Sequence, residues 1–424
     1  MISLDHLVLL TCAVLALYFI VKRRRVAIYL LDFTCYRPPD SHRMPKSMFS
    51  EYIQLEDRMD NEGKALQVKI MERSGYSDET YIPLSLTEMP VKRCYSSGLD
   101  EASTVIFSAV RDLLERTNTS PRAIDILIIN NSVFSPTPSL TAMVINRFGM
   151  RSNVMSFNLS GMGCSAGIVS VALARDLLKI HRNSLALVVS TEVLNGNWYT
   201  GKNKSMLISN CLFRMGSAAI LMSSRGQDKE RAKYKLKYLV RSNKARDDQS
   251  YTCVYQDMDS ENQTGILLSK TLVNVAGDAL KTNMATLGKL TLPLSEQLRY
   301  ALSIIRQTVK GGGKTGIYIP NFKKAFEHFC IHAGGKAVIE AIEKSLKLSQ
   351  EDVEASKMTL FKFGNTSSSS IWYELAYIES KGRMKIGDRV WQIALGSGFK
   401  CNSAVWECIN TAGPDVENVW KGKF

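Results

Sequence analysis

The sequence predicts a mixed, layered α/β protein that is built from two similar halves and preceded by a membrane anchor. Apolar runs of strand length alternate with stretches of helical period between residues 101 and 406. The order strand, glycine turn, helix occurs at 154–179 and again at 328–346, which predicts an internal duplication with a site where the halves meet. A predominantly apolar segment, residues 2–21, is followed directly by a basic cluster.

The apolar segment has the features of a retained transmembrane anchor. Its charge-free part, residues 7–21, is short for a bilayer of about 30 Å, but Lys22 can snorkel and the preceding residues can complete the span. A cleaved signal peptide carries its positive charges before the apolar run, whereas here they follow it at 22–25. Residues 1–25 are therefore predicted to be an anchor with a basic stop, with the rest of the chain in the cytosol. A buried or interfacial helix is the alternative.

The remaining chain divides into three predicted parts. Residues 26–100 begin with a strand-like run and continue as a polar, Met-rich segment that caps the site or lies along the membrane. Residues 101–290 form the first half and 291–424 the second. Within the first half, the charged and poorly patterned residues 229–262 are predicted to be a surface excursion.

Composition narrows the classes of partner. The chain of 424 residues has a formal net charge of +14, which favours anionic partners such as a nucleotide-bearing cofactor or a phospholipid surface. Its basic residues are dispersed and accompany no nucleic-acid-binding motif, so nucleic acid is the weakest candidate. Nine cysteines without CxxC pairs indicate reduced thiols and no structural zinc site; Cys330 and His332 have no second pair of metal ligands beside them in the sequence.

Cys164 is the candidate nucleophile. It lies in the stretch SFNLSGMGCSAGIVSVALARDLLK, residues 156–179, between a strand-like run and a helical pattern. At such an elbow, free N–H groups and the helix dipole favour the thiolate, so a lowered pKa is expected. A small buried hydrophobe is the alternative role for Cys164.

Three stretches of the second half complement this thiol. His332 ends a strand before the turn at 334–335, and Asn365 precedes a helix that Ser367 or Ser368 could cap. A glycine loop at 396–398 offers backbone N–H groups.

Together with Cys164, these stretches resemble the plant 3-ketoacyl-CoA synthases, the membrane-bound condensing enzymes of fatty acid elongation. The resemblance covers most of the chain and rests on YLLDFTCYRPPD, NLSGMGCSAG, HFCIHAGGKAV, FGNTSSSSIWYELAY and GDRVWQIALGSGFKCNSAVW. It implies a duplicated thiolase-like fold with five layers, αβαβα, and a homodimer. It also implies a place in the endoplasmic reticulum membrane, with other fatty acid elongase enzymes as partners.

The resemblance further implies the reaction and its residues. An acyl-CoA and malonyl-CoA would give a 3-oxoacyl-CoA, carbon dioxide and coenzyme A, with no cofactor or metal. Cys164 would hold the acyl group as a thioester, while His332 and Asn365 stabilise the enolate that decarboxylation creates. The backbone N–H groups of Cys164 and Ser397 would form the oxyanion hole, and His328 would orient the site.

Two departures leave an alternative open. Phe361 and Asn243 stand where the family has histidine. A catalytically weak or inactive regulatory partner of the elongase complex is therefore the second hypothesis. A third hypothesis is a soluble polyketide synthase of the chalcone synthase type. Such an enzyme shares the Cys-His-Asn trio, but should lack the anchor and the sequence FGNTSSSSIWYELAY.

Overall fold

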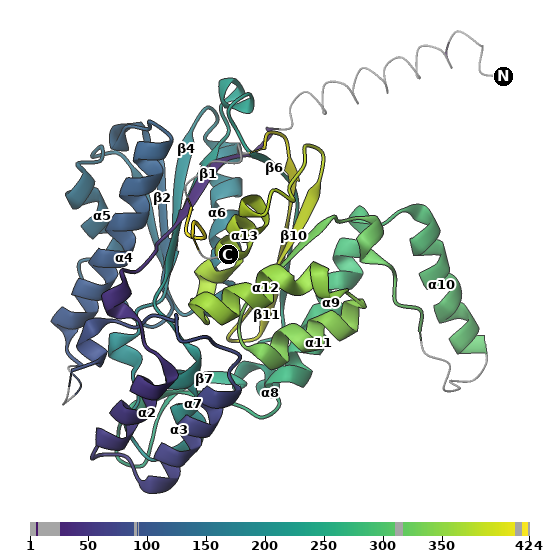
Figure 1. The fold of residues 1–424 in the computed structure, drawn as a ribbon. Helices are drawn as coiled ribbons and strands as arrows, with labels where there is room; N and C mark the ends of the chain where they lie inside the picture. Colours follow the sequence, from purple (N-terminus) through teal and green to yellow (C-terminus); the bar gives the residue numbers. More distant parts are fainter. Residues whose placement is uncertain are drawn as a thin grey trace.

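The computed structural model describes residues 6, 26–88, 91, 93–309, 317–411 and 418–422. Its strands are β1 Tyr29–Cys35, β2 Ile126–Asn130, β3 Met155–Leu159, β4 Leu185–Thr191, β5 Ser217–Ser223, β6 Tyr234–Asn243, β7 Val254–Met258, β8 Thr264–Leu268, β9 His328–Ile331, β10 Arg389–Gly396 and β11 Lys400–Cys408. Its α-helices are α2 Lys46–Leu55, α3 Asn61–Arg73, α4 Tyr95–Arg116, α5 Leu140–Phe148, α6 Ala166–Ile180, α7 Lys204–Leu212, α8 Asp248–Tyr251, α9 Leu272–Thr291, α10 Leu294–Val309, α11 Lys336–Leu346, α12 Gln350–Phe363 and α13 Ser370–Ser380. Figure 1 shows their arrangement.

A mixed sheet of nine strands carries the duplication. Its order is β3-β2-β4-β5-β1-β6-β11-β10-β9. The two sides of this sheet repeat the same pairing. In the first half β4 and β5 are antiparallel neighbours, and in the second half β10 and β11 are antiparallel neighbours. The halves join through β1 and β6, which share only a short antiparallel register at Tyr29 and Leu30. The predicted internal duplication is thus visible in the strand order.

The helices form groups separated by the two parts of the sheet. Helices α4 and α5 pack on the first part, and α9 packs on β6 and β11 of the second. Helices α6 and α13 contact strands of both parts, α6 through β2, β4, β10 and β11, and α13 through β1, β9 and β10. The central helices therefore bring the segments that precede them, near Cys164 and Asn365, into the space between the halves.

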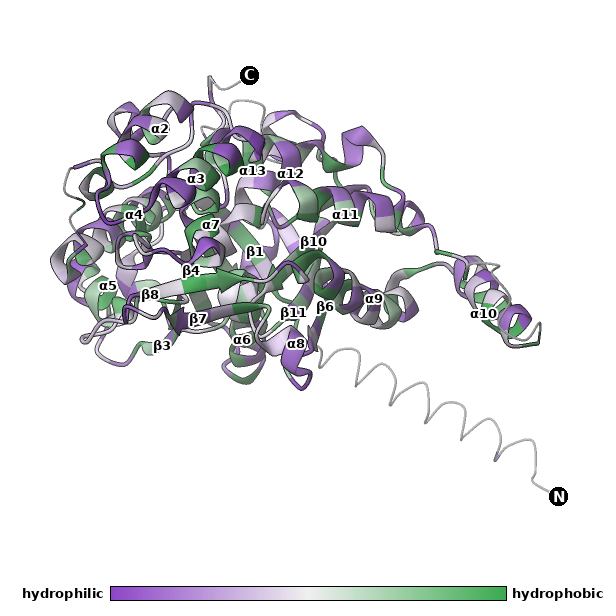
Figure 2. Ribbon diagram, turned by 90° about the horizontal axis from the view of Figure 1, so that it is seen from below, coloured by the Kyte–Doolittle hydropathy of each residue, from purple (hydrophilic) through white to green (hydrophobic). Residues whose placement is uncertain are grey.

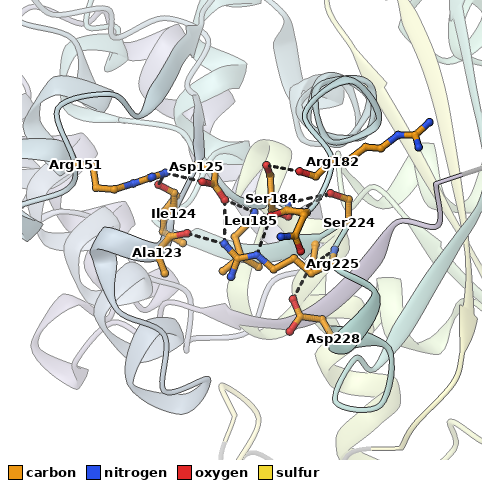
Figure 3. A network of polar contacts seen from close by, with 12 residues as sticks. Ala123, Ile124, Asp125, Arg151, Arg182, Ser184, Leu185, Ser224, Arg225 and Asp228 are labelled. Carbon is orange, nitrogen blue, oxygen red and sulfur yellow. Dashed lines mark hydrogen bonds and ion pairs between the residues drawn. The ribbon is translucent and has the colours of Figure 1, made fainter.

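An ion-pair network fixes one end of the first part of the sheet. Asp125, directly before β2, accepts hydrogen bonds from Arg151 (2.6 Å) and Arg225 (3.1 Å), as well as from the backbone N–H of Leu185 at the start of β4 (2.7 Å) (Figure 3). Because β2, β3 and β4 are parallel, this network lies at their amino ends. Their carboxyl ends are left to carry the site, as is usual in α/β proteins.

One element-level prediction is wrong. Residues 229–262 are not merely a surface excursion, since they contain β6, which pairs with β11 over nine register positions and connects the halves. Its Lys and Arg side chains made the segment resemble a loop, but an antiparallel strand with one solvated face accommodates such residues. Two helices begin earlier than the helical patterns at 101–117 and 298–309 predict: α4 at Tyr95 and α10 at Leu294.

The predicted anchor, residues 1–25, lies outside the described residues except for residue 6. None of the described helices is both long and apolar enough to cross a bilayer.

Candidate active site

Cys164 lies on the predicted elbow between β3 and α6. The chain leaves β3 at Leu159, turns through Gly161 and Gly163 with φ near +68° and +66°, and enters α6 at Ala166. Positive φ is accessible to glycine without steric cost. The elbow therefore places the thiol at the start of a helix that lies between the two halves.

The glycine loop of the second half packs directly against this elbow. A Cβ atom on Gly163 would lie 2.3 Å from the backbone nitrogen of Ser397, and one on Gly396 would lie 2.6 Å from that of Ser165. Neither position can carry a side chain without moving backbone. The sequence pattern therefore brings Cys164 and Ser397 together through two backbone approaches that glycine alone permits.

His332 follows β9 immediately and is buried. Its backbone N–H donates to the carbonyl of Ile393 on β10 (2.9 Å), and its Nδ1 lies 2.8 Å from the hydroxyl of Ser370. Burial lowers the pKa of His332 to about 4, so the imidazole is neutral at pH 7. The Ser370 hydroxyl can donate to Nδ1 or accept from it, so either tautomer of the ring is compatible with this contact.

Asn365 is held between the halves. Its Nδ2 donates to the carbonyl of Gly334 (3.2 Å), and its Oδ1 accepts from the backbone N–H of Ser367 (2.8 Å). Its own carbonyl accepts from the N–H of Arg214 in the first half (2.9 Å). These bonds fix the side chain beside the turn that follows His332.

One cavity of about 390 Å³ brings the predicted residues together. Cys164, His332, Asn365 and Ser397 all line it. Much of the remaining wall is apolar and comes from β7, β8, α9 and the segments around α7: Leu194, Trp198, Leu212, Phe213, Val254, Ile266, Leu268, Leu272 and Ala276. The cavity can therefore place an aliphatic chain beside a thiol, an imidazole and a carboxamide.

The expected lowering of the Cys164 pKa is not found. The pKa of this thiol is raised to about 12: burial is the largest cause, a hydrogen bond with Ser367 partly offsets it, and the charge of the nearby Glu192 carboxylate adds to the rise. Desolvation of the anion outweighs the favourable helix end. In the resting protein the thiol and the imidazole of His332 are therefore both neutral.

Glu192 is a site residue that the sequence analysis missed. It follows β4, lines the cavity and accepts hydrogen bonds from the backbone N–H groups of Ser132 (3.1 Å) and Val133 (3.2 Å). The hydroxyl of Ser367 donates to it as well (3.3 Å). Burial raises the pKa of Glu192 to about 7. A lone acidic residue two positions after the apolar run at 185–190 was the signal in the sequence.

His328 lies away from these groups. It begins β9, at the opposite end of the strand from His332, and its Nε2 is 2.9 Å from a carboxylate oxygen of Asp388. It is not among the residues that line the cavity. The orienting role that the resemblance assigns to His328 stays a prediction.

The two departures from the family pattern also lie outside the cavity. Phe361 is on α12, with 40% of its surface exposed and its ring beside the ammonium of Lys362. Asn243 ends β6, and its Oδ1 accepts from the N–H of Ala245 (2.8 Å). Neither replacement removes a group from the wall beside Cys164.

No group of three His, Cys, Asp or Glu side chains is arranged to hold a metal ion in the part of the chain that the structure describes.

Comparison with solved structures supports the fold. Over 90% of the chain the structure matches 1,3,6,8-tetrahydroxynaphthalene synthase, a type III polyketide synthase of Streptomyces coelicolor A3(2), with a TM-score of 0.68, 18% identity and 100% of that chain covered. A fungal type III polyketide synthase, ORAS, gives a TM-score of 0.71 at 16% identity, with 90% of this chain and 99% of that chain covered. At this identity the likeness shows a shared fold, which is the thiolase-like α/β fold predicted from the sequence.

Sequence comparison identifies the family. Residues 19–309 match the model of the FAE1/type III polyketide synthase-like proteins, and residues 323–408 match that of the C-terminal part of 3-oxoacyl-[acyl-carrier-protein] synthase III. Probable 3-ketoacyl-CoA synthase 21 of Arabidopsis thaliana is 59% identical over 94% of this chain and 86% of that protein. 3-Ketoacyl-CoA synthase 7 of the same plant is 53% identical over 99% of this chain and 91% of that protein. With Cys164, His332 and Asn365 lining one cavity of a thiolase-like fold, the chain belongs to the 3-ketoacyl-CoA synthase family.

Proposed function

We propose that this protein condenses a long-chain acyl-CoA with malonyl-CoA to give a 3-oxoacyl-CoA, carbon dioxide and coenzyme A. The observation that carries the proposal is the convergence of Cys164, His332 and Asn365 on one largely apolar cavity. The family to which the chain belongs is named for that product.

In the first step the acyl group moves from coenzyme A to the thiol. Because the pKa of Cys164 is about 12 and that of His332 about 4, a free thiolate is not the resting nucleophile. His332 takes the thiol proton as sulfur attacks the thioester carbonyl, and the proton then passes to the departing coenzyme A thiolate. This step uses the tautomer in which Nδ1–H donates to Ser370 and Nε2 is unprotonated.

In the second step malonyl-CoA loses carbon dioxide. The electron pair of the broken carbon–carbon bond forms a thioester enolate, whose oxygen accepts hydrogen bonds from His332 Nε2–H and Asn365 Nδ2–H. The enolate carbon attacks the acyl thioester carbonyl, the carbon–sulfur bond breaks, and Cys164 leaves as a thiolate. A proton from solvent restores the thiol and balances the negative charge that the malonyl carboxylate brought in. This step uses the other tautomer, in which Ser370 donates to Nδ1, so the same hydroxyl serves both steps.

The carbonyl oxygen of the acyl thioester becomes negative when it is attacked. The backbone N–H groups of Cys164 and Ser397 are our candidates for its hydrogen-bond donors, supported by the close packing of Gly163 on Ser397. Loss of one such donor typically costs about 3 kcal/mol of barrier, or roughly a hundredfold in rate.

A product assay tests the proposal. Microsomes that contain the full chain are given labelled malonyl-CoA and a panel of long and very long acyl-CoAs, and 3-oxoacyl products are measured. Cys164→Ala should abolish the product, whereas Cys94→Ala, at an exposed cysteine outside the cavity, should not. Absence of product from the unaltered chain, or equal product from Cys164→Ala, would contradict the assignment.

The position of Phe361 and Asn243 bears on the alternative of an inactive regulatory partner. Both lie outside the cavity wall, so their replacement of histidine gives no direct reason for lost chemistry. If they did silence the enzyme, Phe361→His with Asn243→His would switch activity on. We expect the unaltered chain to be active already.

We further propose that residues 1–25 anchor the protein in the endoplasmic reticulum membrane with the catalytic part in the cytosol. The charge order of the segment supports this orientation. Sequons at Asn118 and Asn262 are exposed and would carry glycans in the lumen. Resistance to carbonate extraction and the lack of a glycosidase-sensitive mass shift are the expected results, and release by carbonate or a glycan at either site would overturn the topology.

A homodimer and association with other fatty acid elongase enzymes are also part of the proposal. They are supported by membership of the family, and chemical crosslinking of the full chain in microsomes tests them.

A further inference from the structure

Helix α10 exposes its apolar face to solvent and packs its polar face against the protein, the reverse of the usual arrangement in a globular protein. Five aliphatic side chains recur at helical spacing along it and are between 51% and 79% exposed: Leu294, Leu298, Leu302, Ile305 and Val309, here called the α10 stripe. None of them joins the hydrophobic core of the described chain. Figures 1 and 2 show α10 standing away from the body of the molecule, beyond the end of α9.

The polar face of α10 is the face that packs. Glu296 is fully buried and accepts hydrogen bonds from Tyr318 Oη (2.7 Å), the Asn321 N–H (2.9 Å) and Lys324 Nζ (2.7 Å). Ser303 accepts from the N–H of Tyr318 (3.2 Å). The returning segment 317–324 thus covers the polar side of the helix and leaves the stripe pointing outward. Ile317 and Ile319 on this segment are themselves exposed.

The charges around the stripe identify what covers it. Arg299 and Arg306 each follow a stripe residue by one position, which places both guanidinium groups on one flank, about 90° from the centre of the stripe. The segment 297–326 contains no Asp or Glu, and its charged residues are Arg299, Arg306, Lys310, Lys314, Lys323 and Lys324. An apolar face bordered by cations complements an anionic lipid surface, where the aliphatic groups enter the acyl boundary and the cations meet the headgroups.

A second copy of the chain fits this surface less well. Two α10 stripes packed on each other by an antiparallel twofold axis would bring the guanidinium groups of Arg299 and Arg306 of both copies together. Glu296, the carboxylate 3.7 Å from Arg299 on the same helix, already accepts hydrogen bonds from three other groups, so it cannot neutralise four converging cations. A span across the membrane is excluded by length, because sixteen helical residues reach only about 24 Å and include two arginines.

We propose that α10 lies in the plane of an anionic membrane interface and docks the folded part of the protein on the bilayer. This contact is additional to the anchor at residues 1–25 and independent of the condensing reaction. Helix α9, which contributes Leu272 and Ala276 to the cavity wall, continues through Leu292 and Pro293 into α10. Docking of α10 therefore fixes the orientation of α9, and with it one wall of the cavity, relative to the membrane.

Photolabelling of the full chain tests the proposal. The protein is reconstituted into vesicles of phosphatidylcholine, either alone or with about 30 mol % phosphatidylserine, that contain a phosphatidylcholine with an aliphatic diazirine. Labelled peptides are mapped by mass spectrometry. We expect label within 294–309, more of it in the anionic vesicles, and a loss of that increase in Arg299→Gln with Arg306→Gln.

Two triple variants provide the decisive comparison. Leu298→Ser, Leu302→Ser and Ile305→Ser together should lower the label at 294–309 at least about fivefold. The matched control, Leu55→Ser, Ile180→Ser and Ile386→Ser, changes three aliphatic residues elsewhere that are even more exposed, and it should leave the label at 294–309 unchanged. Circular dichroism of both variants shows that the fold is kept, since all six side chains are exposed.

Three results would overturn the proposal. The first is label in residues 1–25 with none at 294–309 in either vesicle. The second is equal labelling of 294–309 by a water-soluble diazirine, which indicates mere solvent exposure. The third is crosslinking between α10 helices of two copies, which assigns the stripe to a dimer.

Discussion

At the residue scale, the site combines groups whose protonation states are set by burial. Cys164 and His332 are kept neutral, and Glu192 is raised to a pKa of about 7, so its charge varies near physiological pH. That Cys164, His332 and Asn365 would line one cavity could be predicted from the sequence, because each residue lies within a long family motif. The pKa values of Cys164 and His332 could not be predicted, since desolvation depends on the burial that segments from elsewhere in the chain produce around the cavity, β7 and β8 among its walls.

The charge of Glu192 should control the reactivity of Cys164. In Glu192→Gln the negative charge near sulfur is removed, so the pKa of the thiol falls and its alkylation by iodoacetamide at pH 8.5 should become up to about tenfold faster. Mass spectrometry of the Cys164 peptide measures the rate. Glu407→Gln, which changes a β11 carboxylate outside the cavity, is the control and should alkylate at the unaltered rate. An unchanged or slower rate in Glu192→Gln would show that the carboxylate does not influence the thiol.

At the scale of elements, the elbow before α6 and the loop between β10 and β11 form one unit. Gly163 approaches the Ser397 backbone, and Gly396 approaches Ser165. Both turns could be predicted from their glycines, and so could the elements around them. The reciprocal packing could not, because the two turns are more than 230 residues apart and nothing local encodes their contact. The same holds for β6, whose partner strands lie in both halves.

The close approach at Gly163 predicts a large effect of one methyl group. Gly163→Ala adds backbone strain at φ +66° and a clash with Ser397, so the proposed oxyanion donors would be displaced and product formation should fall about a hundredfold or more. Gly149→Ala is matched in backbone conformation, at φ +58°, but its Cβ would meet open space. It should lower stability by only about 1 kcal/mol and keep activity. If both variants lost activity to a similar extent, backbone strain alone would explain the loss, and the contact between Gly163 and Ser397 would not be its cause.

At the scale of the whole molecule, buried carboxylates set the pH range of stability. Glu101 on α4 accepts from the N–H groups of Leu194 (2.8 Å) and Asn195 (2.9 Å), beside the cavity wall, and burial raises its pKa to about 8. Burial also raises the pKa of Glu192, to about 7. A carboxyl with a raised folded-state pKa contributes stability that is complete below its unfolded value of about 4.5 and is lost as pH rises through the folded value.

Thermal stability should therefore fall between pH 5.5 and pH 8.5. In Glu101→Gln the non-titrating amide removes one source of the dependence, so its melting temperature should decline less over this range, by roughly a few degrees. Differential scanning fluorimetry of the full chain in detergent, at matched ionic strength, measures the slope of melting temperature against pH for the unaltered chain and for Glu101→Gln. Identical slopes would mean that Glu101 stays ionised in the folded protein. His332, with its lowered pKa, adds an opposite loss only as pH falls from about 6.5 to 4.

The meeting of the two halves has a consequence for synthesis on the ribosome. Hydroxyls of Ser367 and Ser368 reach Glu192 (3.3 Å) and Asn130 (2.6 Å) in the first half. The thiol is thus translated long before the imidazole, the carboxamide and the last two strands emerge. A nascent chain that ends between residues 164 and 332 would carry the proposed nucleophile without the imidazole and the carboxamide of the proposed mechanism. One that ends after Asn365 but before residue 408 would hold all three groups on an incomplete sheet, so we expect activity only after β11 has been translated.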